Sequence, residues 1–437
     1  MHGDYVSMNT TLHISRKSLL LISLLCVVLV SSLFTYMFVN DSSATSLENT
    51  MHVKTETELK NAINNVSSKE TTIALDNDIT LTQPIVISAN KDIKLVSNKA
   101  SGFYKLIGVD GSSTITVESN GALKLDGVII THKNGDNGRG VDVLEQGQLI
   151  LYRGEISGNT NTGDAKPNTL GGFPSKGGGV YIEYGIFEMY GGKISNNEAN
   201  AGNGGGVYNL GGTFKMESGE ISDNRAIQIT TTGTWCGGDG GGVFNGGNSG
   251  NLTVSGGKIF NNRAANNGGG VFNIGSFILY GGAIYSNTAV GNGDRGSPSG
   301  GYSCGGGVYN INLCSLRGGT ITGNTADWGG GVYYAYSPPY ILGVTISGNT
   351  AKFTGNDIYP DIGSGDGSSG GNDGSSDGNN KQSTDGFGVR ATLVICVIII
   401  VTMNIAMIVL FFYFKKKIAQ VEAKLNTPTK IVRRNKI

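Results

Sequence analysis

The sequence predicts an all-β protein: a single-stranded parallel β-helix of about ten coils with a short N-terminal capping helix, flanked by two transmembrane helices. Two short motifs recur through the middle of the chain, and two long uncharged apolar runs bracket that middle. Glycine supplies 71 of the 437 residues, but prolines number only 8 and glycine does not recur at every third position, which excludes collagen. With 38% hydrophobic and only 15% charged residues, the chain is not wholly disordered either.

The two apolar runs, residues 18–39 and 391–414, are each long enough to cross a bilayer as a helix. The tail 415–437 is strongly basic, so we expect it in the cytoplasm together with residues 1–17. The first run is longer than the apolar part of a usual signal peptide, which favours a retained signal-anchor. Cleavage near Ala44 is the alternative.

These boundaries give a domain plan for an integral plasma-membrane protein. Residues 40–51 form a linker, 52–362 an extracellular β-helix, and 363–390 a flexible Gly/Ser/Asp-rich tether. The formal net charge of zero conceals an acidic exterior and a basic tail, because 31 Asp/Glu and 23 Lys/Arg lie between the apolar runs. We therefore expect no nucleic-acid partner.

The repeat has two motifs that alternate along the chain. Gly-Gly-Gly-Val-aromatic occupies 177–181, 204–208, 240–244, 268–272, 305–309 and 329–333. An Ile-x-x-Asn motif precedes the first of these and follows each of them, and its isoleucines are Ile156, Ile194, Ile221, Ile259, Ile284, Ile321 and Ile346. Units this small cannot bury a core alone, so they must stack. Alternating apolar residues between Gly/Asn turns predict three short strands per coil, because glycine at this density undermines helical repeats.

Two sets of repeated side chains are expected to stack from coil to coil. Asparagine tolerates a left-handed backbone and can hydrogen-bond to its own kind in the next coil. The predicted structural ladder consists of Asn159, Asn197, Asn224, Asn262, Asn287, Asn324 and Asn349. The predicted aromatic series consists of Tyr181, Tyr208, Phe244, Phe272, Tyr309 and Tyr333, a structural stack with a sugar-stacking platform as the alternative. Ahead of the repeats, residues 55–63 read as a short amphipathic helix with an acidic first turn that caps the first coil.

Candidate ligand-binding residues lie in three insertions that enter between the Asn turn and the next glycine motif. The insertions 161–176, 227–239 and 291–304 occur on alternate coils and should line one side of the rod. They carry Asp164, Lys166, Trp235, Asp239, Asp294, Arg295 and Tyr302. Such an aromatic and acidic wall could bind a glycan or calcium, or it could be solvated decoration.

The sequence contains no motif for nucleophilic catalysis, phosphate binding or dinucleotide binding, and we predict no cofactor apart from the calcium just mentioned. His52 and His132 are the only histidines between the apolar runs, and neither lies in the regular repeats. Of the cysteines in that region, Cys236 and Cys304 lie in insertions two coils apart, and a disulfide between them would require the insertions to lean together.

The two motifs resemble the repeats of the chlamydial polymorphic outer membrane proteins, with Gly-Gly-Gly-Val here in place of Gly-Gly-Ala-aliphatic and Ile in place of Phe in Phe-x-x-Asn. More widely, the chain resembles right-handed parallel β-helix proteins of the pectate-lyase-like superfamily, and residues 53–95 are similar to that superfamily's N-terminal cap. The resemblance implies a right-handed coil. It does not select an activity, because adhesins, lyases, hydrolases and epimerases share this architecture.

Three functions are consistent with these observations. The first is a membrane-anchored, non-enzymatic cell-surface rod for adhesion or surface interaction, with a glycan or a protein as its ligand. The second is a membrane-tethered polysaccharide lyase or glycoside hydrolase that uses loop carboxylates, which must then converge with a basic partner or calcium. The third is a passive spacer without any ligand.

Overall fold

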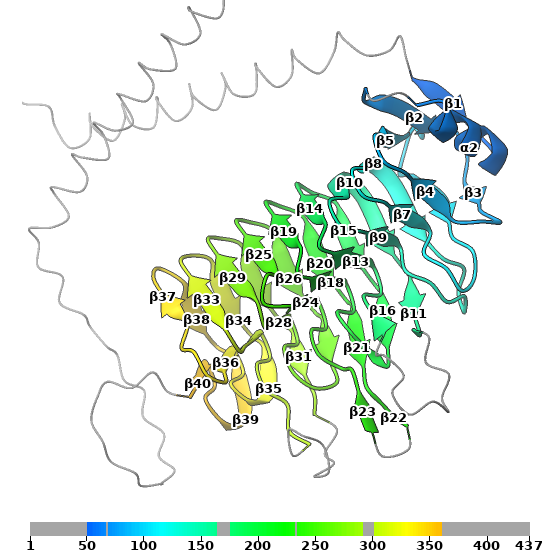
Figure 1. The fold of residues 1–437 in the computed structure, drawn as a ribbon. Coiled ribbons are helices and arrows are strands. Elements are labelled where there is room, and N and C mark those ends of the chain that lie inside the picture. The colour runs from blue at the N-terminus through cyan, green and yellow to red at the C-terminus, as the bar shows by residue number, and fades with distance from the viewer. Residues whose placement is uncertain (1–49, 67–68, 164–174, 232–233, 292–300, 361–437) are drawn as a thin grey trace, which may run out of the picture. The chain divides into compact units, whose positions relative to one another are not determined.

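The computed structural model describes residues 50–66, 69–163, 175–231, 234–291 and 301–360, of which 229–236 are described as backbone only (Figure 1). Both apolar runs, 18–39 and 391–414, and the tether 363–390 lie outside these residues. Within the described residues there is no helix long and apolar enough to span a membrane.

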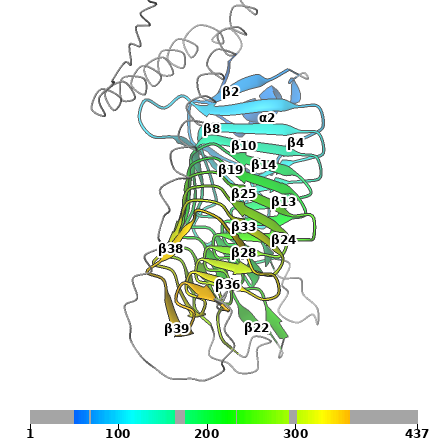
Figure 2. The same cartoon turned by 90° about the vertical axis from the view of Figure 1, so that its left-hand side faces the viewer.

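The described residues form a parallel β-helix. Consecutive coils pair strand on strand in parallel, as in the register Ile186↔Thr213 between neighbouring coils. Figure 2 shows the resulting stack of rungs from a second side. A regular coil has four strands and not the expected three, because two to five residues directly after each Asn turn form an additional short strand.

The four strand positions define four faces of the β-helix. The first face contains β1 (Met51–Val53), β2 (Thr71–Leu75), β5 (Asp92–Ser97), β8 (Ala122–Thr131), β10 (Gln148–Ser157), β14 (Ile186–Met189), β19 (Thr213–Met216), β25 (Asn251–Val254), β29 (Ser276–Leu279), β33 (Leu313–Leu316) and β37 (Tyr340–Ile341). The second face contains β3 (Ile79–Thr80), β6 (Tyr104–Ile107), the ends of β8 and β10, β15 (Lys193–Ser195), β20 (Glu220–Ser222), β26 (Lys258–Phe260), β30 (Ala283–Tyr285), β34 (Thr320–Thr322) and β38 (Thr345–Ser347).

The third face contains β11 (Thr160–Asn161), β16 (Glu198–Asn200), β21 (Arg225–Ile227), β27 (Arg263–Ala264), β31 (Thr288–Ala289), β35 (Thr325–Trp328) and β39 (Thr350–Thr354). The fourth face contains β4 (Ile85–Ile87), β7 (Ile115–Val117), β9 (Val141–Val143), β13 (Val180–Glu183), β18 (Val207–Leu210), β24 (Val243–Gly246), β28 (Val271–Asn273), β32 (Val308–Asn310), β36 (Val332–Tyr334) and β40 (Ile358–Tyr359). Ten parallel strands on this face, one from each coil, agree with the expected coil number. Outside the faces lie the pair β12 (Ser175–Lys176) and β17 (Gly202–Asn203) and the antiparallel hairpin of β22 (Ile229–Thr231) and β23 (Thr234–Cys236).

The predicted N-terminal helix is confirmed as α2 (Glu56–Asn64). Thr55 caps it through a reciprocal capping box with Glu58, which satisfies backbone donors that the first turn leaves free. Leu59, Ala62 and Ile63 are buried against the first coil, so the helix covers that end of the core.

The three consecutive glycines of each motif meet two physical requirements, a left-handed backbone and a close approach of neighbouring coils. In Gly240-Gly241-Gly242 the first residue has a left-handed φ of +68°. A Cβ on Gly241 would lie 2.5 Å from the backbone carbon of Arg263, and one on Gly242 would lie 2.7 Å from the carbonyl oxygen of Gly270, both in the next coil. The motif therefore combines a left-handed turn with two positions at which coils approach backbone to backbone.

The seven repeat asparagines form one continuous buried ladder. In each step the side-chain oxygen of one Asn accepts from both the backbone N–H and the side-chain amide of the Asn before it, as between Asn224 and Asn262 at 3.1 and 3.0 Å. Asp357 accepts from the last member, Asn349, while the His132 ring contacts the first, Asn159, at 2.8 Å.

A second buried ladder was not predicted. It follows the Val-aromatic pair of the glycine motif and runs through Asn209, Asn245, Asn273 and Asn310 with side-chain hydrogen bonds of 2.7–2.8 Å. An asparagine recurs at this position in the sequence. It directly follows the aromatic residue of the motif, and only the aromatic residues were predicted to stack there.

Candidate functional site

Only part of the predicted loop wall falls within the described residues. Asp164, Lys166, Asp294 and Arg295 lie outside them, and Trp235 belongs to β23, where only the backbone is described. Asp239 and Tyr302 are described in full, and the structure gives them different environments.

Asp239 belongs to a column of residues that directly precede the glycine motif. Its Oδ1 accepts hydrogen bonds from the backbone N–H and the side-chain amide of Asn267, both at 3.1 Å. Its own backbone N–H donates to the Oδ1 of Asn203 at 2.9 Å, and the Cys304 N–H donates to Asn267 in turn. Asp239 thus occupies the place of an asparagine in a coil-to-coil ladder, where it links three coils.

Asp239→Asn is expected to stabilise the protein by about 1–2 kcal/mol at pH 8. Burial raises the pKa of the Asp239 carboxyl to about 7, although the hydrogen bonds from Asn267 oppose that shift. Because this folded-state pKa lies above the ordinary 3.8, the proton-bound form is favoured on folding. The free energy of unfolding is therefore not reduced by this group below about pH 4, and it falls as the pH rises from there towards 7.

The measurement is the urea midpoint of the wild type and the variant at pH 4.5 and pH 8. Exposed Asp223→Asn, in the turn of the preceding Ile-x-x-Asn motif, is the matched control. A pH dependence of equal size in the wild type and Asp239→Asn would show that Asp239 is not the group responsible.

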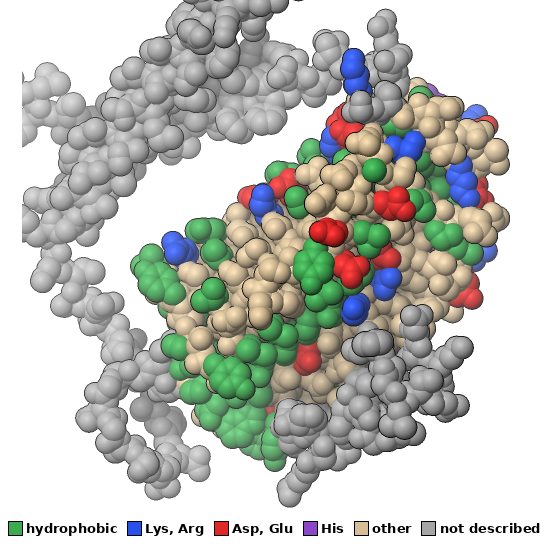
Figure 3. Space-filling model, in the orientation of Figure 1, with side chains coloured by type: hydrophobic (Ala, Val, Ile, Leu, Met, Phe, Trp, Pro, Cys, Tyr) green, Lys and Arg blue, Asp and Glu red, His purple; other side chains and the backbone are tan. Residues whose placement is uncertain are grey.

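Tyr302 lies in a group of aromatic rings that the sequence did not reveal, here called the aromatic cluster. Its ring packs edge-on against Phe353 and Trp328, with ring centroids 5.1 and 6.4 Å away. Trp328 also contacts Phe353 at 5.2 Å and Tyr359 at 5.3 Å. Figure 3 shows hydrophobic side chains gathered at the lower left, over β35, β36, β39 and β40. The cluster thus joins residues from three successive coils at the C-terminal end of the stack.

The cluster continues the predicted aromatic series, which stacks on the outer side of the fourth face. Successive rings from Tyr181 to Tyr333 have centroids 4.6–5.9 Å apart, and Tyr333 stacks on Tyr359 at 5.7 Å. The middle of the series is buried, and burial raises the pKa of Tyr208 to about 12. Tyr309 and Tyr333, at the C-terminal end of the series, are partly exposed, and Phe353 of the aromatic cluster is 46% exposed. A ligand can therefore reach the aromatic rings in the aromatic cluster, whereas it cannot reach them in the middle coils.

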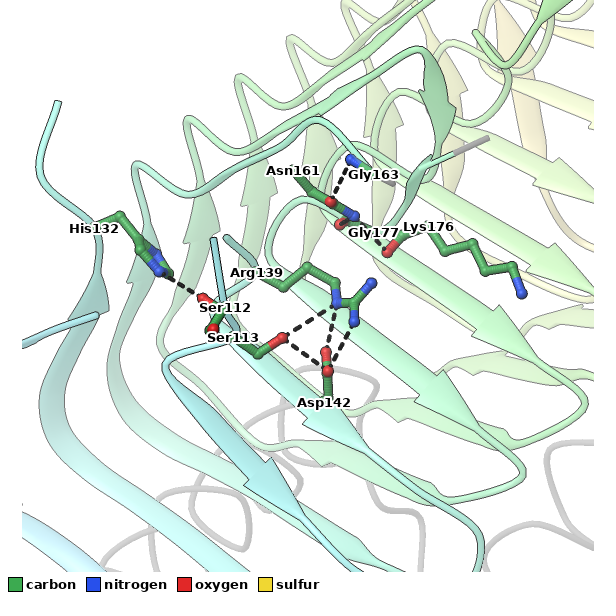
Figure 4. Close-up of polar contacts among 9 residues, drawn as sticks. All are labelled: Ser112, Ser113, His132, Arg139, Asp142, Asn161, Gly163, Lys176 and Gly177. Atoms are coloured by element: carbon green, nitrogen blue, oxygen red, sulfur yellow. Dashed lines mark hydrogen bonds and ion pairs between the residues drawn. The ribbon is translucent and has the colours of Figure 1, made fainter. Parts of the chain in front are cut away.

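At its other end the series meets a charged group. The Arg139 guanidinium lies over the Tyr181 ring at 5.0 Å and donates from Nε and Nη2 to the two carboxylate oxygens of Asp142 at 2.6 and 2.8 Å. The Ser113 hydroxyl donates to the same carboxylate at 2.7 Å (Figure 4). These groups border a hollow of about 380 Å³. Arg139 and Asp142 neutralise each other, so they form a fixed ion pair and not an acid–base pair for catalysis.

Neither a metal site nor a disulfide is present in the part of the chain that the structure describes. No three His, Cys, Asp or Glu side chains gather there as they would around a metal ion. The predicted calcium wall depended on Asp164 and Asp294, which lie outside the described residues. Cys304 and Cys314 are free thiols, and the side chain of Cys236 is not described.

The sequence contained one signal for the aromatic cluster. Trp328 immediately precedes a glycine motif, as Asn203, Asp239 and Cys304 do, and a parallel bridge pairs it with Cys304. Aligning the residue before each glycine motif would have placed Trp328 in the column of Asp239. Phe353 carries no comparable signal, because the last coil lacks the glycine motif.

The fold defines the chain as a parallel β-helix repeat protein. Comparison with protein-family models, curated proteins and solved structures finds no match to it.

Proposed function

We propose that the protein is a membrane-anchored cell-surface rod that binds carbohydrate through the aromatic cluster without catalysing a reaction. In this proposal residues 18–39 and 391–414 are membrane spans, the β-helix is right-handed as in the pectate-lyase-like superfamily, and it stands outside the plasma membrane. The observation that carries the proposal is the contact among Tyr302, Trp328 and Phe353, from separate coils, with Phe353 exposed.

The chemistry of the cluster suits a sugar. Aromatic faces pack against the apolar C–H faces of pyranose rings, while nearby polar groups can fix the orientation of hydroxyls. Lys352 supplies such a group, because its ammonium lies 5.1 Å from the Phe353 ring centre and 3.9 Å from the Asp327 carboxylate. The Asp327 carboxylate in turn accepts from the backbone N–H of Ser303, which holds the segment of Tyr302 in place.

Trp328→Ala is expected to weaken carbohydrate binding by about tenfold or more, because the loss of a central aromatic ring typically costs about 2 kcal/mol. The full chain in detergent is screened on a glycan array, and the affinity for the best ligand is then measured for wild type and variant. Tyr190→Ala removes an exposed ring that stacks on Tyr152, far from the cluster, and should leave binding unchanged.

Other outcomes would select a different function. No ligand on the array would favour the passive spacer, and equal losses in both variants would remove the cluster from the site. Release of shortened or unsaturated sugars from a bound polysaccharide would replace the binding function with that of a lyase or hydrolase.

A further inference from the structure

A second exposed surface lies at the same end of the stack, on the outer side of the first face. It is formed by the last three strands of that face and the residues that follow them, and we call it the terminal apolar surface. Its members are Tyr280, Leu313, Arg317, Tyr340 and Leu342. Leu313 is 64% exposed, and Tyr340 and Leu342 are each 56% exposed. Figure 3 shows hydrophobic side chains gathered at the left end, over β33 and β37.

Exposed apolar side chains are not continuous along the face: Tyr152, Ile186 and Tyr190 are exposed towards its N-terminal part, and polar residues separate them from this end. In the strand register Leu313 follows Thr213, Asn251 and Ser276 of the preceding coils, all of them polar. The repeat itself therefore does not require a leucine at this position. Leu313 contributes nothing to the core, since its strand β33 directs Cys314 and Leu316 inward, and both residues of β37 are exposed.

Arg317 gives the surface a fixed positive charge. Its guanidinium lies between two tyrosine rings, 5.9 Å from the centre of Tyr280 and 5.6 Å from that of Tyr340. Its Nε donates to the Ser315 hydroxyl at 2.9 Å. Within the described residues Arg317 forms no ion pair, whereas other cations on this face, such as Lys94 and Lys215, contact carboxylates at 3.0 Å. The charge is thus held in place by its neighbours, without a carboxylate partner among the described residues.

We propose that the terminal apolar surface rests on the headgroup layer of the lipid bilayer, with Arg317 contacting lipid phosphates and Leu313 and Leu342 entering the outer part of the acyl region. Tyrosine, arginine and exposed leucine together suit that boundary, where aromatic residues concentrate and cations meet anionic lipid. In this proposal, the short length of chain between the β-helix and the second apolar run keeps the β-helix close to the bilayer. From Pro360, the last described residue, only residues 361–390 separate the β-helix from the apolar run 391–414. A segment of that length with the Gly/Ser-rich composition of the tether predicted from the sequence would span roughly 30 Å as a random coil.

This inference rests on the proposed membrane anchoring, and one experiment tests the two separately. The full chain is given a single tryptophan by Trp235→Phe, Trp328→Phe and Leu342→Trp, and is reconstituted into vesicles of phosphatidylcholine and phosphatidylserine. Co-flotation with the vesicles tests anchoring. Quenching of the single tryptophan by lipids brominated in the upper acyl chain tests contact.

We expect the vesicles to carry the protein and the brominated lipids to remove about half of the emission at position 342, since interfacial side chains reach roughly 5–10 Å into the boundary layer. The matched control carries its single tryptophan as Tyr190→Trp, on the same face but several coils away, and should retain its emission. Adding Arg317→Gln should restore most of the emission at position 342.

Each other outcome contradicts a defined statement. Co-flotation without quenching at position 342 overturns the docking and leaves anchoring intact, and so does equal quenching at positions 190 and 342. Failure to co-float overturns both. If unquenched protein is dimeric in detergent and Leu342→Glu makes it monomeric, the surface binds a second copy of the chain and not lipid.

Discussion

Gly241→Ala is expected to lower the free energy of unfolding by about 3 kcal/mol or more, one of the two largest effects of a single substitution in this protein. The added Cβ would meet the backbone carbon of Arg263 at 2.5 Å and the carbonyl oxygen of Gly269 at 2.6 Å. Both atoms are backbone, so no side chain can rotate away. The Gly241 N–H also donates to the carbonyl of Gly268 at 3.1 Å, which fixes the separation of the two coils.

The urea midpoint, followed by far-ultraviolet circular dichroism, measures this effect. Gly111→Ala is the control, because Gly111 has a φ of +81° but no atom within 4 Å of its added Cβ. It should cost only about 1 kcal/mol, the usual penalty of a left-handed alanine. If the two variants lose equal stability, backbone conformation and not the close approach of coils explains the glycine motif.

The position of Gly241 adds a second consequence. Each coil contacts only its neighbours, so the stability of a repeat protein is roughly a sum of coil and interface terms. A weakened interface in the middle of the stack should let the two halves unfold at different urea concentrations. We therefore expect a broader or two-step transition for Gly241→Ala.

The repeated part of the fold could be predicted because each coil meets the same physical requirements as the last. Ile194, Ile221 and Ile259 lie directly above one another in register, so one sequence period is also one spatial period. The capping helix was predictable for a local reason, because Thr55 and Glu58 satisfy the first turn within four residues. The additional strand in each coil was missed because in most coils it has only two or three residues, too few to show a periodicity of their own.

The candidate site could be predicted only in part, because its contacts come from residues without a repeat. Tyr302 and Trp328 were not connected by sequence spacing, since an insertion of variable length precedes one and a glycine motif follows the other. Asp239 was chosen for its charge, yet its carboxyl serves the same hydrogen bonds as an asparagine. Residue type alone does not distinguish a carboxylate that binds a ligand from one that joins two coils.

Asn262→Leu tests the ladder that holds the coils together, and it is expected to cost about 3 kcal/mol or more. Leucine has the same number and branching of side-chain heavy atoms but removes the Oδ1 that accepts from the backbone N–H and side-chain amide of Asn224. It also removes the donor to the carbonyl of Ile221 at 2.9 Å. Two donors and one acceptor then stay buried without these partners, and each buried group left unpaired costs about 1–3 kcal/mol.

The urea midpoint again measures the loss, and exposed Asn251→Ala is the control, because its amide contacts only the carbonyl of Ser249 two residues away. Asn349→Leu, at the last step of the ladder, should cost less than Asn262→Leu, because only the segment that ends the described stack lies beyond it. If position along the ladder makes no difference, each asparagine stabilises its own turn. A graded loss instead means that the ladder couples the coils, so that a break in the middle separates more of the stack than a break at its end.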